Sequence, residues 1–239
     1  MSNGHIGLRG NLDEGEPYGI PGTYLNSFYE VRPLPHAEPG YGYPESGQEV
    51  VNVTNGKLIR LLVDDAPLDV RYGRLMAHER VLDLRAGTLT RDADWESPRG
   101  RRVRVRSTRL VSFTQRALAA IEYVVEPVDA SVRIVVQSEL VANEPIPPRS
   151  GDPRIAAVLE NPLSALDQDL HAGGAVLLHG TRLSGLQMAA GMDHLVEAPV
   201  EVSVESAAMD DCADYVCVQP PAGAAAADCE VPRLRVVQP

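Results

Sequence analysis

Within Thr88–Thr108, apolar and charged residues alternate strictly over residues 92–96 and 102–106, and this pattern constrains the fold of the 239-residue chain more than any other. Ala93 and Trp95 alternate with acidic residues in the first half, and Val103 and Val105 alternate with arginines in the second. A period of two is typical of β-strands that have one buried and one solvated face. The pattern therefore predicts two neighbouring antiparallel strands.

The same pattern predicts how these strands pair if residues 97–101 form the loop between them. A slip of one residue would place every side chain on the wrong face. Because each arginine then faces an acid, we interpret the arginines as a solvated, neutralised sheet face and not as a basic patch. The expected pairs are Glu96 with Arg102, Trp95 with Val103, Asp94 with Arg104, Ala93 with Val105 and Asp92 with Arg106.

Further short strands recur roughly every ten residues, with many turn signals and no long amphipathic helix. This spacing predicts an all-β fold, an antiparallel sandwich. Asn55-Gly56 is a strong hairpin signal, and we expect it to join strands at Val50–Asn52 and Leu58–Val63. The proline-rich stretch Asn143–Asp169 interrupts the rhythm and contains a predicted short helix at Arg154–Glu160.

The net charge of −11, from 33 acidic and 22 basic residues, argues against a nucleic-acid partner and against binding to an anionic membrane. No apolar run reaches the roughly 20 residues that a membrane-spanning helix needs. The N-terminus lacks the apolar core of a signal peptide. The sequence therefore favours a cytoplasmic location. Only Lys57 is a lysine; the other basic residues are arginines.

Three cysteines occur, all in the last part of the chain: Cys212, Cys217 and Cys229. Their odd number does not make a disulfide framework, and their spacing is poor for a zinc site. The six histidines show no i,i+4 or His-X-His spacing. We therefore predict no metal site and no cofactor.

The glycine-rich stretch Gly4–Glu30 contains two strand-like runs separated by a polar, Gly/Pro-broken bend. Its two blocks, NGHIGLRGNLDEG and PGTYLNSFYE, resemble the start of the N-terminal domain of glycoside hydrolase family 65. Later blocks follow the same family pattern: RVLDLRAGTLTRDADW, RVRSTRLVSF, RALAAIEYVVEP and QSELVAN. The resemblance covers residues 3 to about 206. Residues 207–239 form a divergent Ala/Cys-rich segment, a last strand or a truncated linker.

The resemblance implies a large two-sheet super-sandwich, similar to galactose-mutarotase-like β-domains, with one or two short helices. Enzymes of this family act on α-linked glucose disaccharides with inversion. Their catalytic glutamate lies in a helical (α/α)6 barrel that follows the β-domain. No long helical periodicity occurs in this chain, so we expect no catalytic residue in it and no activity from it alone. The implied partners are that barrel domain, an α-glucoside ligand and a second copy in a homodimer.

Two groups of residues are candidates for chemistry. Asp13, Glu14 and Glu16 cluster in the glycine-rich bend, and adjacent carboxylates can divide acid and base roles. We interpret this cluster as a solvated turn, because most such clusters are. Sugar recognition uses exposed aromatic faces, and we predict weak sugar or interdomain contacts for Tyr18, Tyr41 and Tyr43; the alternative is packed, hydrogen-bonded tyrosines.

Two other functions stay open at this point. The first is a free-standing carbohydrate-binding module, which would bind maltose or trehalose through these tyrosines. The second is a mutarotase-like sugar epimerase. An epimerase would require a histidine pair and a carboxylate converging on one concave sheet face.

Overall fold

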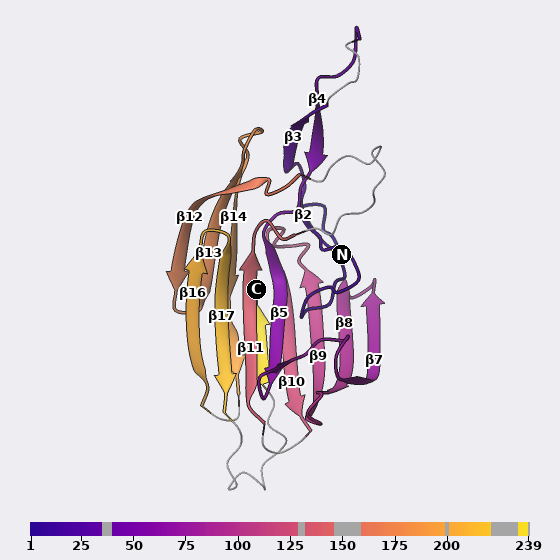
Figure 1. The fold of residues 1–239 in the computed structure, drawn as a ribbon, viewed down its shortest axis with the longest axis vertical. Coiled ribbons are helices and arrows are strands. Elements are labelled where there is room, and N and C mark those ends of the chain that lie inside the picture. Colours follow the sequence, from indigo (N-terminus) through magenta and orange to yellow (C-terminus); the bar gives the residue numbers. More distant parts are fainter. Residues whose placement is uncertain (35–39, 129–131, 146–158, 199–200, 221–233, 239) are drawn as a thin grey trace.

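The computed structural model describes residues 1–239 except 35–39, 129–131, 146–158, 199–200, 221–233 and 239. Within the described residues every regular element is a β-strand, and Figure 1 shows these strands stacked in layers. The predicted all-β sandwich is confirmed. Most of the predicted helix at Arg154–Glu160 lies outside the described residues.

Three sheets form the body of the sandwich. One sheet has six strands: β15 (Leu195–Glu197), β18 (Leu234–Gln238), β10 (Ala119–Pro127), β9 (Arg102–Val111), β8 (Thr88–Glu96) and β7 (Arg74–Asp83). The second has five: β16 (Ser203–Met209), β17 (Cys212–Gln219), β11 (Ile134–Val141), β5 (Asn55–Val63) and β6 (Ala66–Pro67). The third has three, β12 (Leu163–His171), β13 (Gly174–Thr181) and β14 (Gln187–Asp193), and contacts β16 and β17.

Two small sheets complete the described fold, and both come from the N-terminal part of the chain. They pair β1 (Ile6–Leu8) with β2 (Thr23–Leu25), and β3 (Tyr29–Pro33) with β4 (Ser46–Val50). The β3–β4 hairpin projects beyond one end of the sandwich (Figure 1).

The core lies between the inner faces of the three large sheets. Trp95 and Tyr123 of the six-stranded sheet are fully buried with Ile59 of the five-stranded sheet and Leu177 of the three-stranded sheet. Each such side chain contributes on the order of 1.5–3 kcal/mol through the removal of apolar surface from water. The Trp95 indole N–H donates a hydrogen bond to the Tyr72 carbonyl at 2.9 Å, so its polar atom is satisfied inside the core.

The predicted pairing of β8 with β9 is confirmed at all five positions. On the outer face, Arg102 donates to both oxygens of Asp94 at 2.7 and 2.6 Å, and Arg106 donates to Asp92 at 2.8 Å. The Arg102 contact is diagonal, because the acid directly opposite it is Glu96. The interpretation of a solvated, neutralised face is therefore also confirmed.

The Asn55-Gly56 hairpin prediction is wrong. Asn55 opens β5 and pairs with Val141 of β11, while β4 pairs with β3. The Asn55 side chain accepts the Lys57 N–H at 3.1 Å and donates to Glu144 at 2.8 Å. These contacts fix it in an extended segment, so tertiary pairing overrides the local turn preference.

Glu30 attaches the projecting hairpin to the sandwich. Its buried carboxylate accepts backbone N–H groups of Arg182, Leu183 and Ser184 at 2.7–3.2 Å, and one from Val31 at 2.8 Å. Burial raises the pKa of Glu30, but these amide hydrogen bonds outweigh burial and the net pKa is lowered. The carboxylate is therefore ionised at neutral pH.

We expect Glu30→Ala to lower the free energy of unfolding by about 2 kcal/mol, because it removes a buried, charged acceptor that four backbone N–H groups share. Urea unfolding followed by the fluorescence of Trp95, the single tryptophan, would measure this loss. Glu49→Ala is the matched control: Glu49 is on the same hairpin and forms only a half-exposed ion pair with Arg32 at 3.5 Å. Its expected cost is below about 1 kcal/mol. Equal costs for the two variants would contradict the anchoring role of Glu30.

Candidate functional site

Residues 9–22 pack against inward side chains of the six-stranded sheet and contact β5 of the five-stranded sheet, whose edge strand here is the two-residue β6. The Ile59 N–H of β5 donates to the Asp13 carbonyl at 2.8 Å. Arg80 donates to the Gly10 carbonyl, and Arg109 donates to the Arg9 carbonyl at 3.3 Å. The segment therefore takes the place of a further strand and closes this side of the sandwich.

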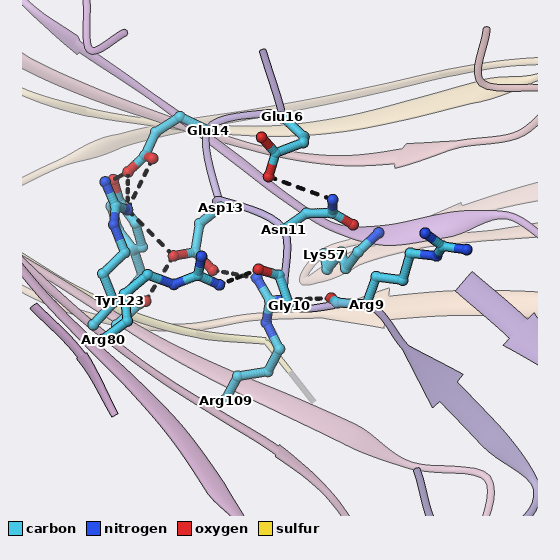
Figure 2. A network of polar contacts seen from close by, with 12 residues as sticks. Arg9, Gly10, Asn11, Asp13, Glu14, Glu16, Lys57, Arg80, Arg109 and Tyr123 are labelled. Carbon is cyan, nitrogen blue, oxygen red and sulfur yellow. Dashed lines mark hydrogen bonds and ion pairs between the residues drawn. The ribbon is translucent and has the colours of Figure 1, made fainter. Parts of the chain in front are cut away.

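Asp13 is the centre of a buried ion network formed by this segment and the sheet (Figure 2). Its carboxylate is 2% exposed and accepts hydrogen bonds from Arg109, from Arg91 at 3.4 Å and from Ser107 at 2.6 Å. Burial raises the pKa of Asp13, but the charges of Arg109 and Arg91 and the Ser107 hydrogen bond bring it below its usual value. Asp13 is therefore ionised at neutral pH.

Glu14 extends the buried ion network to the next strand. Both of its oxygens accept from Arg91 at 2.8 Å, and the Tyr123 hydroxyl donates to it at 2.6 Å. Burial, followed by the Glu14 charge, raises the pKa of Tyr123, so this hydroxyl stays a proton donor. Arg91 also donates through Nε to Nε2 of His78 at 3.1 Å. That nitrogen must carry a lone pair, in agreement with the pKa of His78, which burial and then Arg91 lower.

Lys57 lies buried on β5, with only 2% of the residue exposed. Its ammonium donates to the Thr23 hydroxyl at 3.1 Å and to the Asn55 carbonyl oxygen at 2.9 Å, both neutral groups. The Asn55 amide in turn donates to the Glu144 carboxylate at 2.8 Å. Burial lowers the pKa of Lys57 to about 8, although Glu144 opposes this shift.

The interpretation of Asp13, Glu14 and Glu16 as a solvated turn is wrong for the first two. They are buried because Arg91 and Arg109 occupy inward positions of β8 and β9 and need counterions there. The sequence contained this signal: both arginines fall in the same register as the buried apolar residues. Arginine holds both buried carboxylates, so neither Asp13 nor Glu14 is free to act as a general acid or base.

The three predicted contact tyrosines lie on two separate elements. Tyr18 belongs to the segment that covers the sheet and is 79% exposed. Tyr41 and Tyr43 belong to the loop of the β3–β4 hairpin, and both are exposed. The structure therefore does not bring all three into one site, and their contacts with a sugar or a domain stay a prediction.

The outer face of β7–β10 contains a hollow of about 580 Å³ lined by paired acids and arginines. His78 is the only histidine among its described lining residues, and its ring turns to Arg91 on the inner side. This face thus lacks the histidine pair that an epimerase requires. Among the described residues, no group of three or more histidine, cysteine or acidic side chains could hold a metal. The part of the chain that the structure describes contains no helix with the length and hydropathy of a membrane span.

Comparison with known proteins gives consistent results. The model for "Glycosyl hydrolase family 65, N-terminal domain" matches residues 1–226. An uncharacterized glycosyl hydrolase of Mycobacterium tuberculosis is 64% identical over 213 residues, which cover 89% of this chain and 27% of that protein. The α,α-trehalose phosphorylase of Thermoanaerobacter brockii is 32% identical over 218 residues, which cover 88% and 28%.

A solved structure, a putative kojibiose phosphorylase from the human microbiome, shares the fold with a TM-score of 0.74 at 18% identity. It matches 99% of this chain, which spans 29% of that protein. The chain thus spans little more than a quarter of the length of each of these three proteins. It belongs to glycosyl hydrolase family 65 and represents the N-terminal domain of that family.

Proposed function

We propose that this chain works as the non-catalytic N-terminal domain of an enzyme that cleaves α-linked glucose disaccharides, by phosphorolysis or hydrolysis. Its task is to support the catalytic barrel and to help shape the rim of the active site. The observation that carries the proposal is that the family-defining segment uses its two buried acids to attach itself to the sheet, leaving neither for catalysis. The trehalose, maltose and kojibiose phosphorylases among the relatives support the substrate class.

Two finer parts of this proposal concern assembly and location. A homodimer is supported by the edge strands β7 and β16, along which nearly every residue is exposed. A cytoplasmic location is supported by the free thiols of Cys212 and Cys217.

The proposal is tested with the purified chain and with a mycobacterial relative from which the matching first region has been deleted. With inorganic phosphate and trehalose, maltose or kojibiose, we expect no sugar phosphate and no free glucose from the chain alone. Co-expressed with the truncated relative, the chain should copurify with it and restore cleavage of one of these sugars. Cleavage by the chain alone would refute its non-catalytic role. Failure to copurify, while an intact relative stays active, would refute the supporting role.

A further inference from the structure

A hollow of about 360 Å³ lies between the N-terminal segment and the loop that follows β6. Leu12, Glu16 and Pro17 line it on one side, and Leu68, Asp69 and Arg71 line it on the other. Pockets that take small molecules have volumes of roughly 300–1,000 Å³, so this hollow has room for one sugar ring and not for a chain of several.

The polar groups of the hollow are fixed before any ligand arrives. One oxygen of Glu16 accepts the backbone N–H groups of Tyr18 and Gly19 at 3.3 and 3.0 Å, and its other oxygen has a long 3.4 Å contact with Asn11 (Figure 2). The Leu12 backbone N–H also donates to this carboxylate. Burial raises the pKa of Glu16, but the amide hydrogen bonds outweigh burial and lower it. Glu16 therefore offers an ionised oxygen, held in place, that can accept hydroxyl hydrogen bonds.

The opposite side supplies a second fixed acceptor and a donor. Asp69 accepts from the Arg71 backbone N–H at 2.8 Å and from the Arg71 guanidinium at 2.6–3.0 Å. The Arg71 side chain is 48% exposed, so one face of its guanidinium is open to a ligand. A planar acid beside a planar guanidinium can contact two neighbouring hydroxyls of one ring.

The charge of the lining decides the class of ligand. Three lining carboxylates face two lining arginines, and Asp69 and Glu14 are each already neutralised by an arginine. Arg60 is likewise paired with Glu139. Glu16 remains as an unbalanced negative charge, which disfavours phosphates and other anions. The described residues provide no metal-binding group here, so the chemistry fits a neutral, hydroxyl-rich molecule.

Aromatic and aliphatic surface completes the match to a sugar. Tyr18, next to the lining residue Pro17, is 79% exposed, and Tyr72, next to Arg71, is 61% exposed. The Arg71 guanidinium lies 5.5 Å from the centre of the Tyr72 ring, which holds this side of the hollow together. The apolar floor includes Leu12 and Leu68. A pyranose ring combines polar and apolar surface in the same way, with hydroxyl groups at its edge and C–H groups on its faces.

We propose that this hollow binds one neutral pyranose unit, with Glu16 and Asp69 accepting from its hydroxyls, Arg71 donating to its oxygens and Tyr18 covering one face. The choice of glucose, free or in an α-linked disaccharide, rests on the proposed function. The assignment to a neutral pyranose rests on the hollow alone. Such a site lets the domain retain a substrate or product sugar beside the catalytic barrel.

The test is a titration of the ¹⁵N-labelled 239-residue chain with glucose, maltose and trehalose, followed by amide chemical shifts. We expect saturable shifts of the amides of residues 16, 18, 19 and 69–72, with a Kd on the order of 1 mM. Tyr18→Ala should weaken binding about tenfold and Glu16→Gln several-fold. Tyr43→Ala, which removes an exposed tyrosine on the separate hairpin, should leave the Kd unchanged. Dispersed spectra would show that each variant is folded.

Several outcomes would overturn the site. The first two are the absence of any saturable shift at about 50 mM sugar and shifts confined to the 40–45 loop. The others are equal Kd values for the unchanged chain and Tyr18→Ala, and tighter binding of glucose 1-phosphate than of glucose. The sugar site and the proposed function can be refuted independently of each other. Sugar binding together with a copurified enzyme that cleaves no α-glucoside would keep the hollow and refute the proposed substrate class. Restored cleavage of an α-glucoside without sugar-induced amide shifts would support the proposed function and refute the sugar site in the hollow.

Discussion

Replacing Asp13 by asparagine is expected to lower the free energy of unfolding by about 3–5 kcal/mol at pH 7, because it leaves Arg109 buried without its counterion. The side chain keeps its size, so the loss reports charge and not packing. Urea or guanidinium unfolding followed by Trp95 fluorescence measures it. The matched control is Asp92→Asn on the outer face, where the pair with Arg106 is largely exposed and is worth at most about 1 kcal/mol.

A double variant separates the buried ion network from simple loss of a contact. Asp13→Leu combined with Arg109→Met removes both charges, and we expect it to be more stable than Asp13→Leu alone. A double variant as unstable as the sum of its single variants would contradict this account. So would equal losses for Asp13→Asn and Asp92→Asn.

The pH dependence of the same variant has a definite sign. The pKa of Asp13 is lowered in the folded protein, so its contribution is fully present above the unfolded pKa of about 3.9 and is lost as the pH falls through the folded value. The difference in unfolding free energy between the unchanged chain and Asp13→Asn should therefore be smallest at the lowest pH values measured.

Lys57 is expected to titrate near pH 8, and its burial to destabilise the fold below that pH. In the unfolded chain the amine keeps its proton up to about pH 10.4, so between these two values the unfolded state binds more protons. Stability contributed by Lys57 therefore rises with pH across this window, by about 3 kcal/mol in total. Because Lys57 is the only lysine, ¹³Cε-lysine labelling gives one NMR signal, and its midpoint reads the pKa directly.

Lys57→Met is the control for all other groups that titrate at alkaline pH. The difference in unfolding free energy between the unchanged chain and this variant should move by about 3 kcal/mol in favour of lysine from pH 7 to pH 10.5. A ¹³Cε midpoint near 10.4, or a difference that does not change with pH, would mean that the amine is effectively solvated.

The candidate site was only partly predictable from local sequence. Asp13 and Glu14 were visible as adjacent acids, but whether adjacent acids are solvated depends on what faces them. Their partners come from β8, β9 and β10, more than 75 residues away in the chain. The useful local signal was the presence of Arg91 and Arg109 at inward positions, because a buried guanidinium requires a counterion.

The sequence by itself determined the pairing of β8 with β9, the all-β class and the family. Side chains alternate across a pleated strand, so a strict period of two specifies faces and register without knowledge of the rest of the fold. The tertiary structure alone decided that Asn55-Gly56 begins a strand and that Asp13 is buried. It also decided that the buried Lys57 ammonium donates to the neutral side chains of Thr23 and Asn55. These outcomes depend on segments distant in the chain, whose burial and pairing energies exceed any local preference.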